Sequence, residues 1–536
     1  MYRRTWTSWE VGCLLVAIPV ALPILVTLSE LLFGDRSIWL HLWDTVLFDY
    51  LSNTLLLMLI VGVLATLIGV STAWLTSQYQ FPMSRWFPVL LVLPLAAPSY
   101  VVGYVYADFL DYSGPLQTSL RAMGIDQQLP SIRSLAGAGL VISLVLYPYI
   151  YLLTRVSFQQ QSAGYLQAAR SLGANQWKVM MQVSIPLARP AIIGGLALVL
   201  METLADYGVV EHYGVPTFTT GIFRTWFAMG EPGGALQLAA CLFIIAAVLI
   251  SFEQLSRRGS TANLISSSTP QEPARLYGVK SWAATMFCLL PVTLGFFIPF
   301  AVLIQYSIES GDSLFASKLL DLVGNTLTVA LTAALVCLIA AIWLAYAARQ
   351  RPNPITQVGI RISTLGYAIP GMVLAVGLLK PLATVDRQIA GFVLEQFETN
   401  IGLLMTGSIT ALVLVYTARF LTVSFNNIHS GLSQVHTRLD EVAATLGSGR
   451  LKTLRKLHLP LLRPALASAL LLVFIDVVKE LPATLVLRPF NYETLATRVY
   501  RLASDERLAE ASTAAIMIVL LGLIPTALLI LKPHKS

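Results

Sequence analysis

Five charged residues lie inside apolar stretches of the chain, in two groups with matching spacing. Glu202 and Asp206 lie in METLADYGVV, and FIDVVKELPATL contains Asp476, Lys479 and Glu480. Residues at positions i and i+4 share one face of a helix, so each group would present its acids together. Carboxylate oxygens suit hard cations, and ionisable groups inside a membrane are expensive to bury. These acids are therefore candidates for the wall of a cation pathway.

Two interpretations of these groups remain open. In the functional one, the acids line a pathway or its outer gate. In the structural one, Lys479 neutralises Asp476 and Glu480, and the acids cap broken helices or pair with an arginine on a neighbouring span. Gly208 and Pro482 each follow the second acid, and both residue types weaken helices.

The elements that must position these groups are membrane helices. Of the 536 residues, 56% are hydrophobic and 12% are charged, and the mean hydropathy is +0.72. A spanning helix needs about 20 apolar residues, and on that basis the sequence predicts about twelve spans. They are expected near 11–33, 52–78, 86–110, 135–157, 188–212, 234–255, 281–306, 323–348, 358–380, 402–425, 464–488 and 511–532. We therefore expect an all-α polytopic membrane protein embedded in lipid.

The charge distribution predicts the orientation of these spans. If the N-terminus is cytoplasmic, most of the 35 Lys and Arg lie in cytoplasmic segments and most of the 28 Asp and Glu lie outside, as the positive-inside rule requires. Both termini are then cytoplasmic. The net charge of +7 is an orientation signal, and no nucleic-acid partner is expected.

The remaining candidates for metal or redox chemistry carry no usable spacing. The four cysteines are scattered through apolar runs, and the six histidines are dispersed. His458, in a basic loop, is expected to be solvated. The stretch 98–112 gathers tyrosines and acids, which we expect to form an aromatic belt at the outer interface in preference to a hard-metal site. Its members are Tyr100, Tyr104, Tyr106, Asp108, Asp111 and Tyr112.

The chain consists of two copies of one unit. SNTLLLMLI at 52 aligns with GNTLTVALT at 324, an offset of 272 (324 minus 52), and Gly173 aligns with Gly447 at an offset of 274 (447 minus 173). Each half holds an even number of spans, so the repeat is parallel, and a pathway would form where the halves meet. The predicted units are a first repeat 1–255, a polar cytoplasmic linker 256–280 with little structure, and a second repeat 281–536.

Each half contains a polar interruption, at 159–187 and at 426–463. Helix-favouring residues precede a glycine that permits the positive φ of a helix C-cap. A short basic helix follows, and a proline suits the first turn of the next membrane helix. This order predicts a helix–turn–helix elbow at the cytoplasmic surface. A single copy would be explained by a basic loop at anionic lipid, but the same interval in both halves argues for a paired device.

The two interruptions resemble the EAA signature of ABC-importer permeases, in which Glu-Ala-Ala is followed by Gly and then by Ile-x-Leu-Pro. The matching residues are Gln167, Ala168, Ala169, Gly173 and Pro186 in the first copy, and Glu441, Val442, Ala443, Gly447 and Pro460 in the second. The resemblance implies the type I importer permease fold, with each loop forming a coupling helix that docks an ATPase subunit. Gln167 stands where Glu is usual, so the two docking sites would differ in strength.

The resemblance also implies partners and a location. It predicts two cytoplasmic ATPase subunits, which carry the ATP and Mg, an extracytoplasmic substrate-binding protein, and a place in the bacterial inner membrane. The sequence has no GxxxxGK(S/T) phosphate loop, so hydrolysis is expected on the separate subunit. We assign this chain no catalytic residue, no bound cofactor and no metal site.

The acid-containing stretches further resemble two-domain ferric-iron permeases, which implies ferric iron as the cargo. The same machinery could serve another cargo, such as thiamine, a polyamine or an anion. An ion-coupled secondary transporter is the alternative from another class, since parallel halves and buried acids would permit it. The twin elbows argue against that alternative, because such a carrier needs no docking loops.

Overall fold

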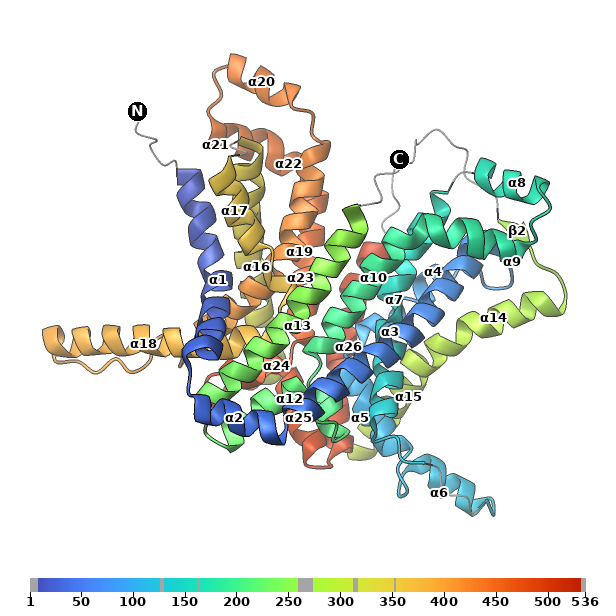
Figure 1. The fold of residues 1–536 in the computed structure, drawn as a ribbon, viewed down its shortest axis with the longest axis horizontal. Helices are drawn as coiled ribbons and strands as arrows, with labels where there is room; N and C mark the ends of the chain where they lie inside the picture. Colours follow the sequence, from blue (N-terminus) through green and yellow to red (C-terminus); the bar gives the residue numbers. More distant parts are fainter. Residues whose placement is uncertain are drawn as a thin grey trace.

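The computed structural model describes residues 8–125, 130–161, 163–258, 273–311, 317–350 and 353–531, and helices dominate it (Figure 1). The first half contains α1 (Ser8–Phe33), α2 (Arg36–Thr45), α3 (Leu47–Gln78), β1 (Tyr79–Gln80), α4 (Phe87–Leu90), η1 (Leu93–Ala96), α5 (Ser99–Phe109), α6 (Pro115–Ala122), α7 (Leu135–Gln159), α8 (Ala163–Ser171), α9 (Gln176–Val179), η2 (Met180–Ser184), α10 (Ile185–Ala205), α11 (Gly208–His212), α12 (Phe218–Phe223), η3 (Arg224–Ala228) and α13 (Pro232–Arg258).

The second half repeats this order. It contains β2 (Ala274–Arg275), α14 (Val279–Val292), η4 (Thr293–Phe297), α15 (Ile298–Ser310), α16 (Ser317–Gln350), α17 (Pro354–Ser363), η5 (Gly366–Ala368), α18 (Gly371–Phe397), α19 (Ile409–Gln434), α20 (Arg438–Thr445), α21 (Arg450–Thr453), η6 (Leu454–His458), α22 (Leu459–Leu461), α23 (Arg463–Lys479), α24 (Pro482–Leu487), α25 (Leu495–Ser504) and α26 (Leu508–Leu531).

The helices confirm the all-α polytopic fold. Within the described residues, 8 helices are long and apolar enough to cross a membrane, and three bent pairs raise that number to as many as 11. Leu508–Leu523 is a shorter apolar helix. These segments (eight, three and one) follow the order of the predicted spans.

Two predicted spans, 86–110 and 358–380, are bent and not straight. The helices on either side of Pro98 meet at 84°, and those on either side of Pro370 meet at 119°. Ala97 (φ −93°, ψ 129°) and Ile369 (φ −97°, ψ 128°) are extended, because the ring of a following proline disfavours helical backbone. The sequence analysis aligned these two prolines but did not predict that each would break its helix.

Other boundaries also differ from the prediction. The predicted span 188–212 is interrupted after α10, and the predicted span 464–488 is interrupted after α23. The helix expected over 402–425 begins only at Ile409, and α18 continues to Phe397, so that it projects sideways from the body (Figure 1). Most of the predicted linker lies outside the described residues. Its described end forms the strand β2, which pairs in parallel with β1.

Equivalent helices of the two halves pack in the same way. In the first half α3 contacts α7 and α10, and α7 contacts α10; in the second, α16 contacts α19 and α23, and α19 contacts α23. Each bundle therefore has the same three-helix centre, as the sequence repeat predicts. A continuous core of buried apolar side chains extends through both halves.

The first helix of each half packs against the other half. α1 contacts α16, α17 and α18, and Trp9 lies 4.4 Å from Trp343 between ring centroids. Reciprocally, α15 contacts α5, and the Tyr106 hydroxyl donates a hydrogen bond to the carbonyl oxygen of Leu294 at 2.6 Å. The two halves are thus interlocked. Both elbows, α8–α9 and α20–α22, lie at the end of the molecule where α1 begins (Figure 1).

Candidate functional site

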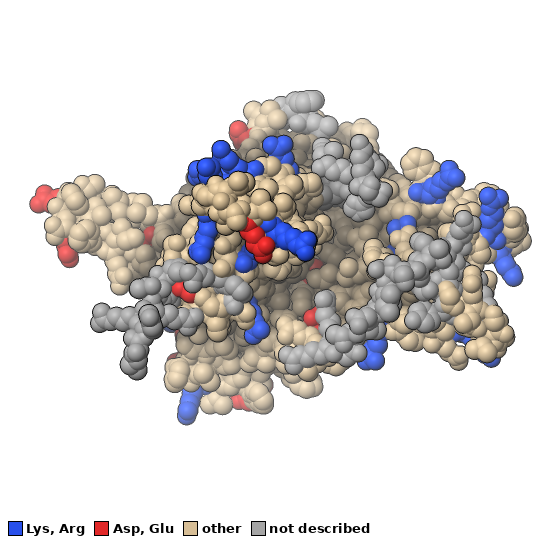
Figure 2. All heavy atoms as spheres, turned by 90° about the horizontal axis from the view of Figure 1, so that it is seen from above, with Lys and Arg blue, Asp and Glu red and all other residues tan. Residues whose placement is uncertain are grey.

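A cavity of about 120 Å³ lies where the two halves meet. Its lining includes every predicted pathway residue: Glu202, Asp206, Asp476, Lys479 and Glu480. The helix break at Pro98 and the breaks after α10 and α23 also reach this wall. The folded chain therefore brings together the acids that the sequence separates by more than half its length. Seen from the elbow end, the surface is hollowed between the two halves (Figure 2).

Asp206 joins the end of α10 to the start of α11. Its Oδ1 accepts hydrogen bonds from the backbone N–H groups of Val209 (3.1 Å) and Val210 (3.4 Å), and its Oδ2 accepts one from the Ser99 hydroxyl at 2.7 Å. The Asp206 carboxylate thus accepts hydrogen bonds from N–H groups in the first turn of α11, which have no acceptor within that helix. This is the cap expected in the structural interpretation of the acids.

Glu480 occupies the equivalent position in the second half. Its Oε1 accepts from the N–H of Ala483 at 3.0 Å, and its Oε2 accepts from the N–H of Thr484 at 3.1 Å and from the Thr484 hydroxyl at 2.9 Å. The partners are again three and four residues further along the chain, so both halves build the same capped break. Pro482 at the start of α24 provides no N–H and needs no partner.

The cation that these acids face is an arginine on a neighbouring span, as the structural interpretation allowed, although the sequence analysis did not identify which one. Arg419, on α19, has a side chain that is only 7% exposed, with Nη1 3.1 Å from Glu480 Oε1 and Nη2 3.7 Å from Glu202 Oε2. It lies inside the predicted span 402–425, where a lone arginine in an apolar run was the signal that could have found it. A planar guanidinium can serve two carboxylates at once.

Lys479 makes a contact that neither interpretation predicted. Its Nζ donates a hydrogen bond to the carbonyl oxygen of Leu95, in the broken loop of the first half, at 3.0 Å. The expected neutralisation of Glu480 by Lys479 is therefore wrong, because Glu480 pairs with Arg419. Glu202 keeps a side chain that is 28% exposed, and it lies with Asp476 in the cavity wall.

The tyrosines of α5 do not form the expected belt. Tyr100, Tyr104 and Tyr106 are buried within the molecule, and only Tyr112 is exposed. Tyr306 donates a hydrogen bond to Asp108. These side chains pack between the halves, because the bend at Pro98 directs α5 inward. Across the described residues, no group of three or more His, Cys, Asp and Glu side chains is placed to hold a metal ion.

The two elbows turn at their glycines. Gly173 has φ +81° and Gly447 has φ +71°, a conformation that other residues adopt only with strain. After each turn the N–H of the next residue returns to the preceding helix, from Ala174 to the carbonyl of Ala169 (3.1 Å) and from Ser448 to that of Ala443 (2.9 Å). These are the C-caps that the sequence predicted.

The motif residues before each glycine are accessible. Gln167 and Ala168 are exposed and Ala169 is half-buried; Glu441 and Val442 are exposed and Ala443 is half-buried. The same side chains of the two short helices α8 and α20 therefore face outward in both halves. Exposure of these helices leaves them available for contact with another protein.

Pro186 and Pro460 lie in the first turn of α10 and of α22, as expected, but each of these helices continues directly from the turn before it. Pro186 lies within one continuous helix, Gln176–Ala205, and a π-turn over Met180–Ser184 precedes it. Pro460 follows the equivalent π-turn over Leu454–His458, and the chain then bends by 77° at Leu462. A wider turn before each proline relieves the clash that its ring would make in a regular helix.

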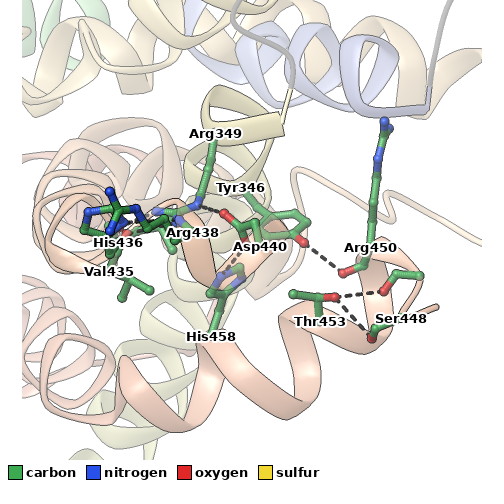
Figure 3. Close-up of polar contacts among 12 residues, drawn as sticks. Tyr346, Arg349, Val435, His436, Arg438, Asp440, Ser448, Arg450, Thr453 and His458 are labelled. Carbon is green, nitrogen blue, oxygen red and sulfur yellow. Dashed lines mark hydrogen bonds and ion pairs between the residues drawn. The ribbon is translucent and has the colours of Figure 1, made fainter. Parts of the chain in front are cut away.

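The second elbow is held by a cluster of three polar side chains, Arg349, Asp440 and His458 (Figure 3). Arg349 Nε lies 2.7 Å from Asp440 Oδ2, and its Nη1 and Nη2 donate to the carbonyl oxygens of Leu432 (2.7 Å) and Val435 (2.9 Å). His458 Nε2 lies 2.9 Å from Asp440 Oδ1. We call these three residues the anchoring cluster, because they join α20 to α16 and to the end of α19.

His458 is fully buried, with a side-chain exposure of 0%. The expectation of a solvated histidine was therefore wrong. Its ring lies 5.6 Å from that of Tyr346, whose hydroxyl donates to the carbonyl oxygen of Arg450 at 2.8 Å. A basic, polar sequence around His458 favours a loop, and nothing in it indicates that a π-turn would direct the histidine against α16.

Among the side chains that the structure describes in the first elbow, no such cluster is found. At the repeat offsets, Arg349 corresponds to Ser77 (349 minus 272) and His458 to Ser184 (458 minus 274). Neutral hydrogen bonds hold the first elbow instead, from Gln161 Nε2 to the carbonyl oxygen of Ser184 at 2.9 Å and from the Tyr79 hydroxyl to Gln176 Oε1 at 2.7 Å. The two elbows share a shape and differ in chemistry.

Basic side chains gather on the face that carries both elbows (Figure 2). Among the described side chains, the exposed basic residues of the elbows are Lys178, Arg438, Arg450, Lys452, Arg455 and Lys456. Basic groups collect on the cytoplasmic side of membrane proteins. The second elbow carries most of them.

The fold and site define a helical membrane permease built from two parallel repeats. Residues 65–259 and 337–531 each match the family of binding-protein-dependent transport system inner membrane components. These matches cover most of the chain, so the chain belongs to this family, which supplies the membrane permeases of ABC importers. Both matched regions include one elbow and one pair of acids.

Named relatives support the same class. The chain is 27% identical over 532 residues to Fe(3+)-transport system permease protein FbpB 2 of Haemophilus influenzae, covering 96% of each chain. It is 30% identical over 188 residues to molybdenum transport system permease protein ModB of Escherichia coli, covering 34% of this chain and 80% of the relative. It is 25% identical over 211 residues to a probable sulfate transport system permease protein of Chlorokybus atmophyticus, covering 39% of this chain and 71% of the relative.

Proposed function

We propose that this chain is the membrane-spanning permease subunit of an ATP-driven importer for ferric iron, with its pathway between the two halves. The observation that supports it most directly is the pair of elbows, each with a positive-φ glycine and an exposed motif helix. Two ATPase subunits would dock there, one on each elbow, with ATP and Mg held by those subunits. A substrate-binding protein would deliver the cargo at the opposite end.

The orientation proposal follows from the elbows and their charge. The elbow face is basic and also carries the start of α1, so we propose that this end faces the cytoplasm. Both chain termini would lie on that side of the bacterial inner membrane. ATP binding would bring the ATPases together, move both elbows, and open the cavity between the halves to the outside.

The charge of the cavity supports a cationic cargo. Four carboxylates line it, from Glu202, Asp206, Asp476 and Glu480, against two basic groups. An excess of acid attracts hard cations and repels oxyanions such as the sulfate that one relative is named for. The similarity to the Fe(3+) relative along nearly the whole chain agrees with this choice. Thiamine, polyamine and anion remain cargoes to be tested beside ferric iron.

Reconstitution tests the proposal. The permease is placed in vesicles with its co-purifying ATPase and the matching binding protein, and uptake of radiolabelled ferric iron is measured with and without ATP. Uptake should require ATP and should resist competition by excess molybdate, sulfate or thiamine. ATP-independent uptake without a co-purifying ATPase would establish the secondary transporter instead. ATP-dependent uptake of another cargo alone would keep the importer and reject iron.

A further inference from the structure

The two capped helix breaks differ at one position. Ser99, which begins α5, donates its hydroxyl to Asp206, whereas the equivalent residue that begins α18 is Gly371 (99 plus 272). A Cβ at Gly371 would lie 2.5 Å from Arg419 Nη1 and 2.8 Å from Glu480 Oε1. Real Cβ atoms essentially never approach other heavy atoms so closely. The missing side chain therefore provides the space that the guanidinium occupies.

Arg419 is a substitute for the hydroxyl of the first half. In the first half the capping carboxylate receives a neutral hydrogen bond from Ser99 at 2.7 Å; in the second it receives a charged one from Arg419 at 3.1 Å. The repeat offsets of 272 to 274 place the equivalent of Arg419 at one of the positions 145–147, and these hold only Val, Leu and Tyr. The repeat has thus placed one cation, and a glycine to accommodate it, on one side of the interface only.

The same cation reaches across the interface between the halves. Arg419 and Glu480 belong to the second half, and Glu202, 3.7 Å from Arg419 Nη2, belongs to α10 of the first. Lys479 makes a second cross-half contact, to the carbonyl oxygen of Leu95. Both contacts lie in the wall of the cavity. Separation of the halves at this level must break them.

We propose that Arg419, seated over Gly371, is a gating residue of the transport pathway. Its ion pair with Glu202 holds the halves together at the cavity, and release of that pair accompanies opening. This inference rests on the proposed importer function. When Arg419 releases Glu202, a cation in the cavity can bind the free carboxylate. The guanidinium of Arg419 and the cargo therefore compete for Glu202.

The rate of basal ATP hydrolysis tests the gating role of Arg419. In the reconstituted complex without binding protein, Arg419→Gln and Glu202→Gln should each raise ATP hydrolysis about fivefold, because loss of one coupling contact shifts a conformational equilibrium by that order. Arg419→Lys keeps the charge but loses the planar fork that serves two carboxylates, so its basal hydrolysis should lie between those of wild type and Arg419→Gln. Arg387→Gln changes an exposed arginine on α18 and should have no effect. An assembly defect alone would lower hydrolysis in proportion to the ATPase retained.

Gly371→Ser tests whether the space at Gly371 is needed to hold the guanidinium of Arg419. The added side chain displaces the guanidinium, so this variant should reproduce the rise in basal hydrolysis, and the double variant Gly371→Ser with Arg419→Gln should show no further rise. Gly391→Ser on the same helix, where an added Cβ meets nothing within 4 Å, is the matched control. The gating role is rejected if an assembled, transporting complex shows wild-type basal hydrolysis in Arg419→Gln and in Gly371→Ser. If the wild-type complex shows no ATP-dependent uptake, the importer function itself is rejected.

Discussion

Arg349 and Asp440 join the second elbow to the membrane helices, with Arg349 Nε 2.7 Å from Asp440 Oδ2. The two side chains are 11% and 23% exposed, so water weakens their attraction only partly. The same guanidinium also holds two carbonyl oxygens at the end of α19. One side chain therefore connects α16, the end of α19 and the short helix α20. A displacement of α20 by a docked ATPase would be transmitted directly to both long helices.

Loss of this contact should separate ATP hydrolysis from transport. Arg349→Gln leaves Asp440 and two carbonyl groups without their partner, which should lower the free energy of unfolding by about 1–3 kcal/mol. Uptake per ATP hydrolysed should fall, because the elbow moves without its helices. Arg349→Lys keeps the charge but loses the planar fork and should be intermediate. Thermal unfolding of the purified permease and the ratio of uptake to hydrolysis are the measurements; an unchanged ratio in Arg349→Gln contradicts the transmission role.

The turn of the second elbow should be required for ATPase docking. Gly447→Pro is incompatible with φ +71°, because the proline ring fixes φ near −65°. The variant should lose ATPase association in a pull-down from detergent while remaining folded by circular dichroism. Gly402→Pro, at another loop glycine with φ +65°, controls for general damage. A normal complex with Gly447→Pro would remove this elbow as a docking site.

The two elbows should bind their ATPases unequally. Glu441 is exposed on α20, and its counterpart Gln167 on α8 carries no charge. Glu441→Gln should weaken ATPase association by about twofold to fivefold, the range of one exposed ion pair, and Gln167→Glu should strengthen it by a similar factor. Titration of ATPase onto the permease in nanodiscs, at low and high salt, measures both. Equal affinities in all three proteins would show that this position makes no charged contact.

The capping acids should matter for uptake and not for assembly. Glu480→Gln keeps the shape but loses a charged cap and the partner of Arg419, so uptake should fall about tenfold, as for loss of roughly 1.4 kcal/mol. Uptake should fall less in Asp206→Asn, because the hydrogen-bond donors to Asp206 (Ser99 and two backbone N–H groups) are neutral. Both should retain bound ATPase through purification. Wild-type uptake in Glu480→Gln and in Glu202→Gln would remove the acids from the mechanism.

The sequence was enough for the large-scale organisation, because apolar length and internal repetition are properties of the chain itself. The spans, the parallel halves and the turns at Gly173 and Gly447 follow from composition and spacing. The bends at Pro98 and Pro370 were within reach, since the residue before proline resists helical backbone. They were missed because a long apolar run predicts a straight span.

The partners of the site residues were less accessible, because they depend on packing between segments distant in the sequence. Lys479 was the nearest cation to Glu480 in the chain, yet Arg419 is its partner in space. The Arg419–Glu480 pair depends on the space that the missing side chain of Gly371 leaves. Nothing around Gly371 in the sequence indicates that a guanidinium will occupy this space. His458 likewise looked like a loop residue until the π-turn placed it beneath Asp440.

The exchange of first helices has a consequence for how such a machine is assembled. Because α1 packs on the second half, and α15 contacts α5 of the first half as well as α26 of its own, each half presents an incomplete surface that its counterpart completes. Two chains cut between Arg258 and Pro273 should therefore find each other, while two identical copies of one half should not. Joining the halves in one polypeptide fixes their stoichiometry at one to one. A single arginine can then serve acids from both halves without a second, equivalent arginine to repel it.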